Sequence, residues 1–397
     1  MTTIADRWGT HPEHFWLCGR RPEQPVQYDE KLGMWNVYGY PEALAVLGDP
    51  RIFSSDVGRV YPCNIDESFN EGDLSQMDPP KHRKLRTLVS HAFTPKIVAD
   101  LEPRISGLTH ELLDAMAGKD QVELIADFAF PLPMIVIAEL LGVPAGDRQL
   151  FRQWMDKMLE GTYAIAPIDD EEGQVRELDK QLEQLREMTE YWHEHAAERR
   201  RRPRQDLLSH LVHAEVDGTR LTEIQVVNIA NLMLVAGHHT TTMLLGNTVL
   251  CLDACPDQAA RVRDDRSMVP TLIEESLRFL SPVAGIMRAT TTEVDLAGQR
   301  VPRDQALMVW CGAANRDERR FPRPDAFDAA RDPNPHLGFG RGNHFCLGAS
   351  LARLEGRIAL NVLLDRYPVL RTDPDNPPVF MQVIDATGPA TLPLRTR

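Results

Sequence analysis

Apolar residues recur at three- and four-residue spacing along most of the chain, from about residue 80 to about residue 280. This spacing places the apolar side chains on one face, so it predicts a series of amphipathic helices. A last amphipathic stretch, from Leu347 to about Tyr367, predicts one more helix near the C-terminus. Residues 317–345 are rich in Pro, Asp, Arg and Gly and predict a long ordered loop, a feature that usually carries function.

Short stretches near both ends have the pattern of strands. Pro25–Tyr28 and Met34–Tyr38 alternate loosely around a Lys-Leu-Gly turn and predict a hairpin, and a short helix is expected from Pro41 to Leu47. Residues 290–301 predict short strands around a turn at Ala297 and Gly298. No Ser/Gly-rich linker or low-complexity block divides the chain. We therefore expect a mainly α fold, a helix-rich single domain over residues 1–397 with small β-sheets.

Composition and charge exclude several classes of function. The net charge of −14 argues against a nucleic-acid-binding protein. The one basic cluster, Arg199 to Arg202, is expected to be a solvated helix end. The longest apolar run is too short to cross a bilayer, and the N-terminus lacks the apolar stretch of a signal peptide. Six scattered cysteines are too few for a disulfide framework in 397 residues, so a cytoplasmic protein without membrane contact is expected.

The segment FGRGNHFCLGA, residues 339–349, is the strongest chemical signal in the chain. Glycines allow tight turns and a close approach of the backbone to a flat ligand. Cys346 stands directly before the predicted helix, where free amides stabilise an anion and can hydrogen-bond a metal-bound thiolate. A zinc site is disfavoured because no second cysteine lies nearby at zinc-ligand spacing.

This segment resembles the haem-binding loop of the cytochrome P-450 family, and every position of that motif is present. The resemblance implies a bacterial haem-thiolate monooxygenase with Cys346 as the iron ligand and haem b as the cofactor. It also implies that Phe339, Gly340 and Gly348 border the haem. The similarity continues in order from about residue 36 to residue 367, which is nearly the whole chain.

A second motif, AGHHTT at residues 236–241, lies inside a long predicted helix whose capping box is Thr222 and Gln225. The Thr240 hydroxyl can bond to the Ala236 carbonyl and bend the helix, and Ala236 and Gly237 leave room for dioxygen. The resemblance makes Thr240 the residue that assists oxygen activation.

His239 occupies a position where the family normally has an acid. Imidazole titrates near neutrality, so His239 either relays protons or packs in a polar pocket. No role is assigned to His238.

Basic residues elsewhere in the chain match the family's pattern for the haem carboxylates. His82 and Arg86 share one helical face in DPPKHRKLR, although alone they would predict a solvated helix start. By the resemblance, Arg288 and His344 join them at the two propionates. Glu275, Arg278 and Arg331 resemble the family's buried structural set and are not expected to be catalytic.

The resemblance places the substrate pocket in five segments, most of them aliphatic: residues 53–78, 160–172, 232–236, 283–287 and 383–384. A largely apolar small molecule is therefore expected to be hydroxylated or epoxidised, in natural-product tailoring or catabolism. Residues 160–172 could form a lid. Electrons are expected from a ferredoxin and its reductase, docked on a basic patch of Arg83, Lys84, Arg341, Arg353 and Arg357.

Three alternatives remain open from the sequence. One keeps the haem but performs oxidative coupling, ring closure or desaturation without net oxygen insertion. A second is a haem-containing binding or sensor protein without turnover, and a third is a zinc or redox-thiol protein.

Overall fold

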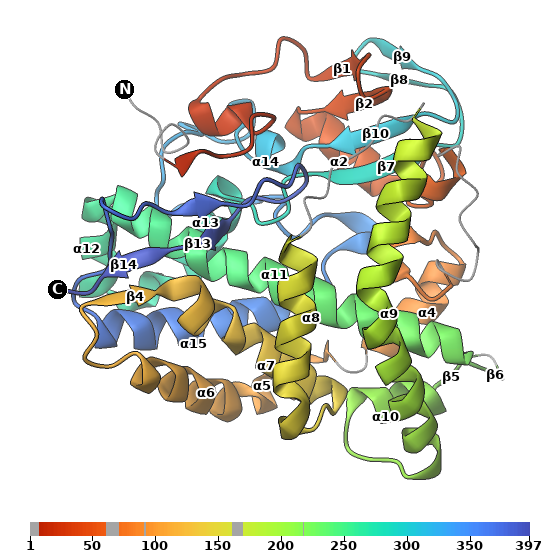
Figure 1. Ribbon diagram of the computed structural model, residues 1–397. Coiled ribbons are helices and arrows are strands. Elements are labelled where there is room, and N and C mark those ends of the chain that lie inside the picture. The colour runs from red at the N-terminus through yellow and green to blue at the C-terminus, as the bar shows by residue number, and fades with distance from the viewer. Residues whose placement is uncertain (1–7, 61–70, 91–92, 161–169, 217) are drawn as a thin grey trace.

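The computed structural model describes residues 8–60, 71–90, 93–160, 170–216 and 218–397, and its fold is mainly α with small sheets, as predicted (Figure 1). The helices are α2 (Tyr40–Gly48), α4 (Lys81–Ser90), α5 (Pro95–Asp100), α6 (Glu102–Ala115), α7 (Pro131–Leu141), α8 (Arg148–Glu160), α9 (Glu171–Arg201), α10 (Leu207–His213), α11 (Glu223–Ala254), α12 (Pro256–Asp264), α13 (Val269–Phe279), α14 (Cys311–Ala314) and α15 (Ala349–Arg366).

The largest sheet joins strands from both ends of the chain. Its order is β1 (Val26–Asp29), β2 (Met34–Val37), β10 (Ala306–Val309), β7 (Ile286–Thr290) and β3 (Phe53–Ser54). The predicted hairpin is therefore confirmed as β1 and β2, but β2 also pairs in parallel with β10. A second sheet has the order β11 (Arg371–Thr372), β14 (Pro393–Arg395) and β4 (Gln121–Glu123).

The remaining strands pair two by two. They are β5 (Glu215–Val216) with β6 (Thr219–Arg220), β8 (Val294–Leu296) with β9 (Gln299–Val301), and β12 (Val379–Phe380) with β13 (Pro389–Thr391).

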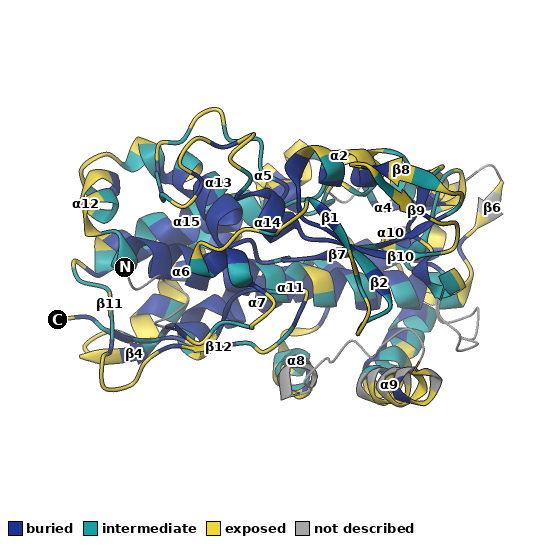
Figure 2. Ribbon diagram, turned by 90° about the horizontal axis from the view of Figure 1, so that it is seen from above, coloured by how far each residue is buried: buried dark blue, intermediate teal, exposed yellow. Residues whose placement is uncertain are grey.

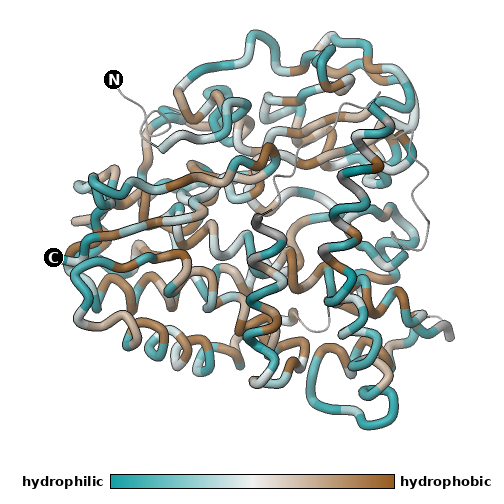
Figure 3. Tube along the Cα trace, in the orientation of Figure 1, coloured by the Kyte–Doolittle hydropathy of each residue, from teal (hydrophilic) through white to brown (hydrophobic). Residues whose placement is uncertain are grey.

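Helix α11 runs through the centre of the molecule and contacts α7, α9, α13 and α15. Its N-terminus has the predicted capping box: the Thr222 side chain accepts from the Gln225 amide, and the Gln225 side chain accepts from the Thr222 amide. Most of α11 is buried, whereas α8 and α9 lie at the edge of the molecule with exposed outer faces (Figure 2). The hydropathy of α9 agrees, because hydrophilic residues dominate its length (Figure 3).

A buried ion network ties α13 to the long loop that precedes the cysteine. Glu275 and Arg278 are fully buried, and Glu275 accepts two hydrogen bonds from Arg278 at 2.8 Å. Arg331 donates to the same carboxylate at 3.0 Å. The three residues thus come together as the resemblance implied, and they hold the segment that leads into the cysteine loop.

One expectation from the basic cluster is wrong. Arg199 is not solvated but 0 % exposed. It donates to Asp206 at 2.7 Å and to the carbonyl of Gly142 at 2.8 Å, and it is ion-paired with Glu198. Its charge therefore joins the end of α9 to the start of α10, a contact that a run of arginines does not reveal.

Two predicted pocket segments lie partly outside the described residues. These are residues 61–70 of the irregular segment and residues 161–169 of the expected lid. Among the residues that the structure describes, no helix is both long and apolar enough to span a membrane.

Candidate active site

The cysteine loop, residues 339–346, is a tight turn that leads into α15. Gly342 has a positive φ of 71°, and a Cβ there would lie 2.6 Å from a backbone oxygen of α2. Glycine is therefore required at this turn. The Cys346 amide donates to the Phe339 carbonyl at 2.9 Å, which closes the loop and sets the cysteine just before the helix.

Different groups around the Cys346 sulfur shift its pKa in opposite directions. Burial raises the pKa of the thiol. The amides of Gly348 and Ala349 and the positive charges of Arg86 and Arg353 act in the other direction. Two backbone donors and two guanidinium groups are thus arranged to stabilise a thiolate once a metal replaces the proton.

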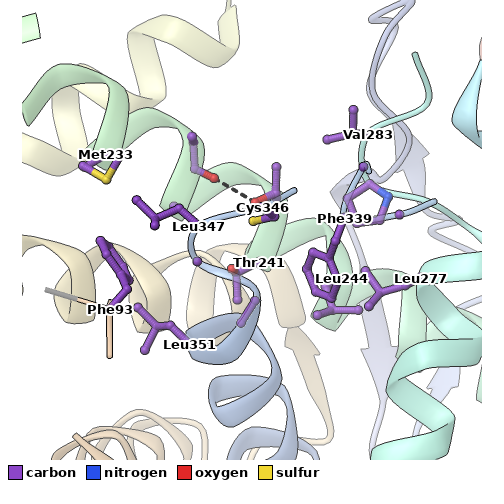
Figure 4. A pocket seen from close by; sticks show the side chains of 18 of the residues that line it. Phe93, Met233, Thr241, Leu244, Leu277, Val283, Phe339, Cys346, Leu347 and Leu351 are labelled. Carbon is purple, nitrogen blue, oxygen red and sulfur yellow. Dashed lines mark hydrogen bonds between the residues drawn. The ribbon is translucent and has the colours of Figure 1, made fainter. Parts of the chain in front are cut away.

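A cavity of about 360 Å³ lies between this loop and α11 (Figure 4). One wall comes from the cysteine loop and α15, with Phe339, Gly340, His344, Cys346, Leu347, Gly348 and Leu351. The opposite wall comes from α11, with Met233, Ala236, Gly237, Thr240, Thr241 and Leu244, and Val283 and Ile286 add a side wall. Because most of these side chains are aliphatic or aromatic, the cavity suits an apolar ligand.

The α11 wall carries the predicted bend residues. The Thr240 hydroxyl donates to the Ala236 carbonyl at 2.8 Å, as expected. Ala236 is exposed although it lies in the middle of a central helix, because the cavity is beside it. Gly237 lines the cavity, but it has a second role that the sequence did not predict. A Cβ there would lie 3.3 Å from the Ile137 side chain, so this glycine also permits close packing against α7.

The two histidines of α11 are not among the residues that line the cavity. His238 is fully buried, and its Nε2 lies 3.2 Å from the carbonyl oxygen of Phe130. Burial lowers the pKa of His239 to about 4, and the Nε2 of His239 has no hydrogen-bond partner within the described part of the chain. His239 is therefore a neutral imidazole at neutral pH.

Four basic residues gather beside the cavity. The His82 and His344 rings are 4.2 Å apart, and Nε2 of His344 lies 2.9 Å from the Ser55 hydroxyl. Burial, followed by the positive charge of Arg288, lowers the pKa of His344 to about 3. Arg86 also lowers the pKa of both histidines, so all four groups share one environment.

The two arginines of this group have no anionic partner in the described part of the chain. Across the described ranges, neither Arg86 nor Arg288 forms an ion pair, although Arg288 is only 5 % exposed. The nearby Asp78 accepts from the Ser55 amide at 3.0 Å instead, and His82 Nε2 is buried without a hydrogen-bond partner among the residues that the structure describes. A ligand with carboxylate groups would satisfy this cluster.

Space for a flat ligand exists on the cysteine side as well. Gly348 lines the cavity, and a Cβ placed on it would meet no atom within 4 Å. Together with the sulfur environment and the unpaired cations, this open face fits the haem that the sequence predicted.

The predicted substrate segments contribute unequally. Met233 and Ala236 line the cavity from segment 232–236, Val283 and Ile286 line it from segment 283–287, and Ser75 lines it from segment 53–78. Residues 383–384 are not among the lining residues.

The sequence prediction missed an ionisable residue of the cavity. Glu355 on α15 lines it, is 2 % exposed, and has no hydrogen-bond partner for Oε2 among described residues. Burial raises its pKa to about 8, so the side chain is an uncharged carboxylic acid at neutral pH. The only signal in the sequence is an acid on the apolar stripe of an amphipathic helix.

Comparison with known proteins agrees with this site. A family model for cytochrome P-450 matches residues 27–392. The chain is 43 % identical over 355 residues to the cyclomarin C epoxidase CymV of Salinispora arenicola, covering 89 % of this chain and 88 % of that one. It is 39 % identical over 381 residues to the erythromycin C-12 hydroxylase of Saccharopolyspora erythraea, covering 95 % and 93 %.

A solved structure also resembles this chain over its full length. The post-tailoring hydroxylase HmtN of himastatin biosynthesis superimposes with a TM-score of 0.90 at 58 % identity, covering 100 % of both chains. With the family model spanning most of the chain and the relatives named as epoxidase and hydroxylases, the chain belongs to the cytochrome P-450 family of haem-iron monooxygenases.

Proposed function

We propose that this enzyme hydroxylates or epoxidises a largely apolar small molecule in the tailoring of a natural product. The observation that carries the proposal is the apolar cavity with Cys346 on one wall and the Ala236–Thr240 bend on the other. The relatives named as epoxidase and hydroxylases support the same class of reaction. We further propose that the whole chain is one domain and acts in the cytoplasm.

We assign haem b to this cavity, with Cys346 as the iron ligand. His82, Arg86, Arg288 and His344 would pair with its two carboxylates, and the walls would come from Phe339, Gly340, Gly348, Ala236 and Gly237. When bound, this group supplies the reduction of dioxygen and the transfer of one oxygen atom to the substrate.

Thr240, together with water, is proposed to assist proton delivery to dioxygen, because its own proton is donated to the Ala236 carbonyl and its oxygen can accept a hydrogen bond from that water. Its hydroxyl lies on the cavity wall and is oriented by its hydrogen bond to the Ala236 carbonyl. His239 is proposed to act as a neutral relay, which accepts a proton on one nitrogen as it releases the proton on the other. It holds no stored charge at neutral pH because burial lowers its pKa to about 4.

An acidic ferredoxin, reduced by its reductase, is the proposed electron donor. The predicted basic patch is smaller than expected, since Arg353 pairs with Glu274 at 2.7 Å and Arg357 pairs with Glu102 at 2.9 Å. Arg83 and Arg341 stay exposed, and beside Cys346 the aromatic ring of Phe345 is 41 % exposed. An exposed aromatic residue among cations suits a small, transient docking surface.

The test is an absorbance titration of the purified ferric protein with macrolides, terpenoids, steroids and small aromatic compounds. A Soret shift to shorter wavelength, followed by oxygen from labelled dioxygen in the product, would support the proposal. Turnover without label in the product would instead identify coupling, ring closure or desaturation. A folded, haem-supplemented protein without a haem spectrum would overturn the proposal.

A further inference from the structure

Arg353, in the second turn of α15, packs against the cysteine loop. The central carbon of its guanidinium group lies 4.6 Å from the centre of the Phe339 ring, which is within the range of a cation–π contact. Phe339 lines the same cavity as Cys346 (Figure 4), and its carbonyl oxygen accepts from the Cys346 amide at 2.9 Å. Arg353 therefore contacts the cavity wall that carries the cysteine.

The guanidinium group of Arg353 is fixed by a carboxylate of α13. Glu274 accepts from Nε of Arg353 at 2.7 Å and from Nη2 at 2.8 Å. A pair with two parallel hydrogen bonds fixes direction as well as distance. Nδ1 of His336 accepts from the Gly338 amide at 3.1 Å, so its Nε2 carries the proton and donates to Glu274 at 3.0 Å. The loop, α13 and α15 thus hold one cation against one aromatic ring.

Both members of the Arg353–Glu274 pair are charged at neutral pH. Burial opposes the ionisation of Glu274, but the hydrogen bonds from Arg353 and His336 outweigh it and lower its pKa to about 2. The hydrogen bond to Glu274 raises the pKa of Arg353. The electrostatic field at the cysteine loop therefore includes a fixed cation and its fixed counter-ion.

We propose that Arg353 is a positioning residue for electron uptake: it holds the Phe339 ring at the cavity wall, and its charge, opposed by that of Glu274, sets how readily the haem iron is reduced. This inference rests on the proposed function, because it assumes that haem occupies the cavity with Cys346 as the iron ligand. Reduction adds one electron to the iron, so a nearby cation stabilises the reduced state and a nearby anion stabilises the oxidised state.

The test is an equilibrium reduction of the substrate-free holoenzyme by dithionite, with redox dyes as mediators and absorbance as the readout. No protein partner is present, so docking of an electron donor plays no part. Arg353→Met removes the cation and leaves Glu274 charged. At a fixed potential, the ratio of ferrous to ferric haem should fall about threefold, the scale of one part-exposed charge. This corresponds to about 28 mV, since a tenfold change is about 59 mV for one electron.

Glu274→Gln keeps the shape of the carboxylate but removes the anion, so the same ratio should rise by about the same factor. The double variant Arg353→Met with Glu274→Gln should return close to the wild-type ratio. Loosened packing between α13 and α15 would act in the same direction in both single variants, whereas the charges act in opposite directions. If Arg353→Met does not retain haem, the rise in Glu274→Gln decides alone.

Arg357→Met is the matched control. Arg357 lies one turn further along α15, pairs with Glu102 at 2.9 Å, and its side chain is 41 % exposed against 40 % for Arg353. In the described part of the chain it lies over no aromatic ring, and its loss should leave the ratio unchanged.

Shifts of the two single variants in the same direction, no shift in either, or an equal shift in Arg357→Met would overturn this inference alone. A wild type without a haem spectrum would overturn the proposed function and this inference with it.

Discussion

Replacing Glu275 with glutamine removes the negative charge from the centre of the buried ion network. The carboxylate accepts from Arg278 twice at 2.8 Å, from Arg331 at 3.0 Å and from the Asp328 amide at 2.9 Å. Arg278 is fully buried and also donates to carbonyls of the loop, including that of Pro324 at 2.8 Å. Glutamine keeps the shape but leaves two guanidinium groups facing each other without an anion.

The expected loss of unfolding free energy is large. Breaking a buried ion pair from one side costs about 3–5 kcal/mol, because an uncompensated charge stays in the interior. Total stability of a folded protein is only about 5–15 kcal/mol. Because the network holds the segment before the cysteine loop, we also expect less haem per protein molecule in Glu275→Gln than in the wild type.

The assay is urea unfolding at neutral pH, followed by circular dichroism, together with haem content from absorbance. Glu274→Gln is the matched control, since the Glu274 carboxylate pairs with the part-exposed Arg353 at 2.7 Å and lies 3.0 Å from Nε2 of His336. This control substitution should lower the free energy of unfolding by about 1 kcal/mol. If both variants lose the same free energy and retain the same haem, the reasoning about burial is wrong.

Three further predictions concern the cavity. Cys346→Ala should abolish the thiolate-type spectrum of the ferrous carbon monoxide complex, and an unchanged spectrum would contradict the ligand assignment. His239→Glu should keep or improve product formed per electron if the imidazole is a weak relay, whereas a collapse of that yield would show a specific role for it. Glu355→Gln should change how stability depends on pH. Its folded pKa of about 8 lies above the ordinary 4.5, so the stabilising effect of its proton is complete below about pH 4.5 and is lost as the pH rises to about 8. From urea unfolding curves, the free energy of unfolding of the variant should gain on that of the wild type over this window by up to about 5 kcal/mol, and parallel pH profiles would refute this.

Features that depend on neighbours in sequence were predictable from the sequence alone. The capping box at Thr222, the Thr240 bond to Ala236 and the glycine turns before Cys346 all involve residues within a few positions of one another. The family motif added the order of the site residues along the chain. Local geometry follows from local sequence because the backbone allows few conformations.

Other features depend on contacts across hundreds of residues, and only the tertiary structure decided them. The parallel pairing of β2 with β10, the burial of Arg199 and the neutralisation of Arg357 by Glu102 are of this kind. So is the contact between Nε2 of the buried His14 and the carbonyl oxygen of Ile384 at 2.8 Å. Whether a charged side chain is paired, buried or solvated depends on which groups from distant parts of the chain surround it. Hydrophobic burial and electrostatic interactions depend on these three-dimensional surroundings, and sequence spacing does not reveal them.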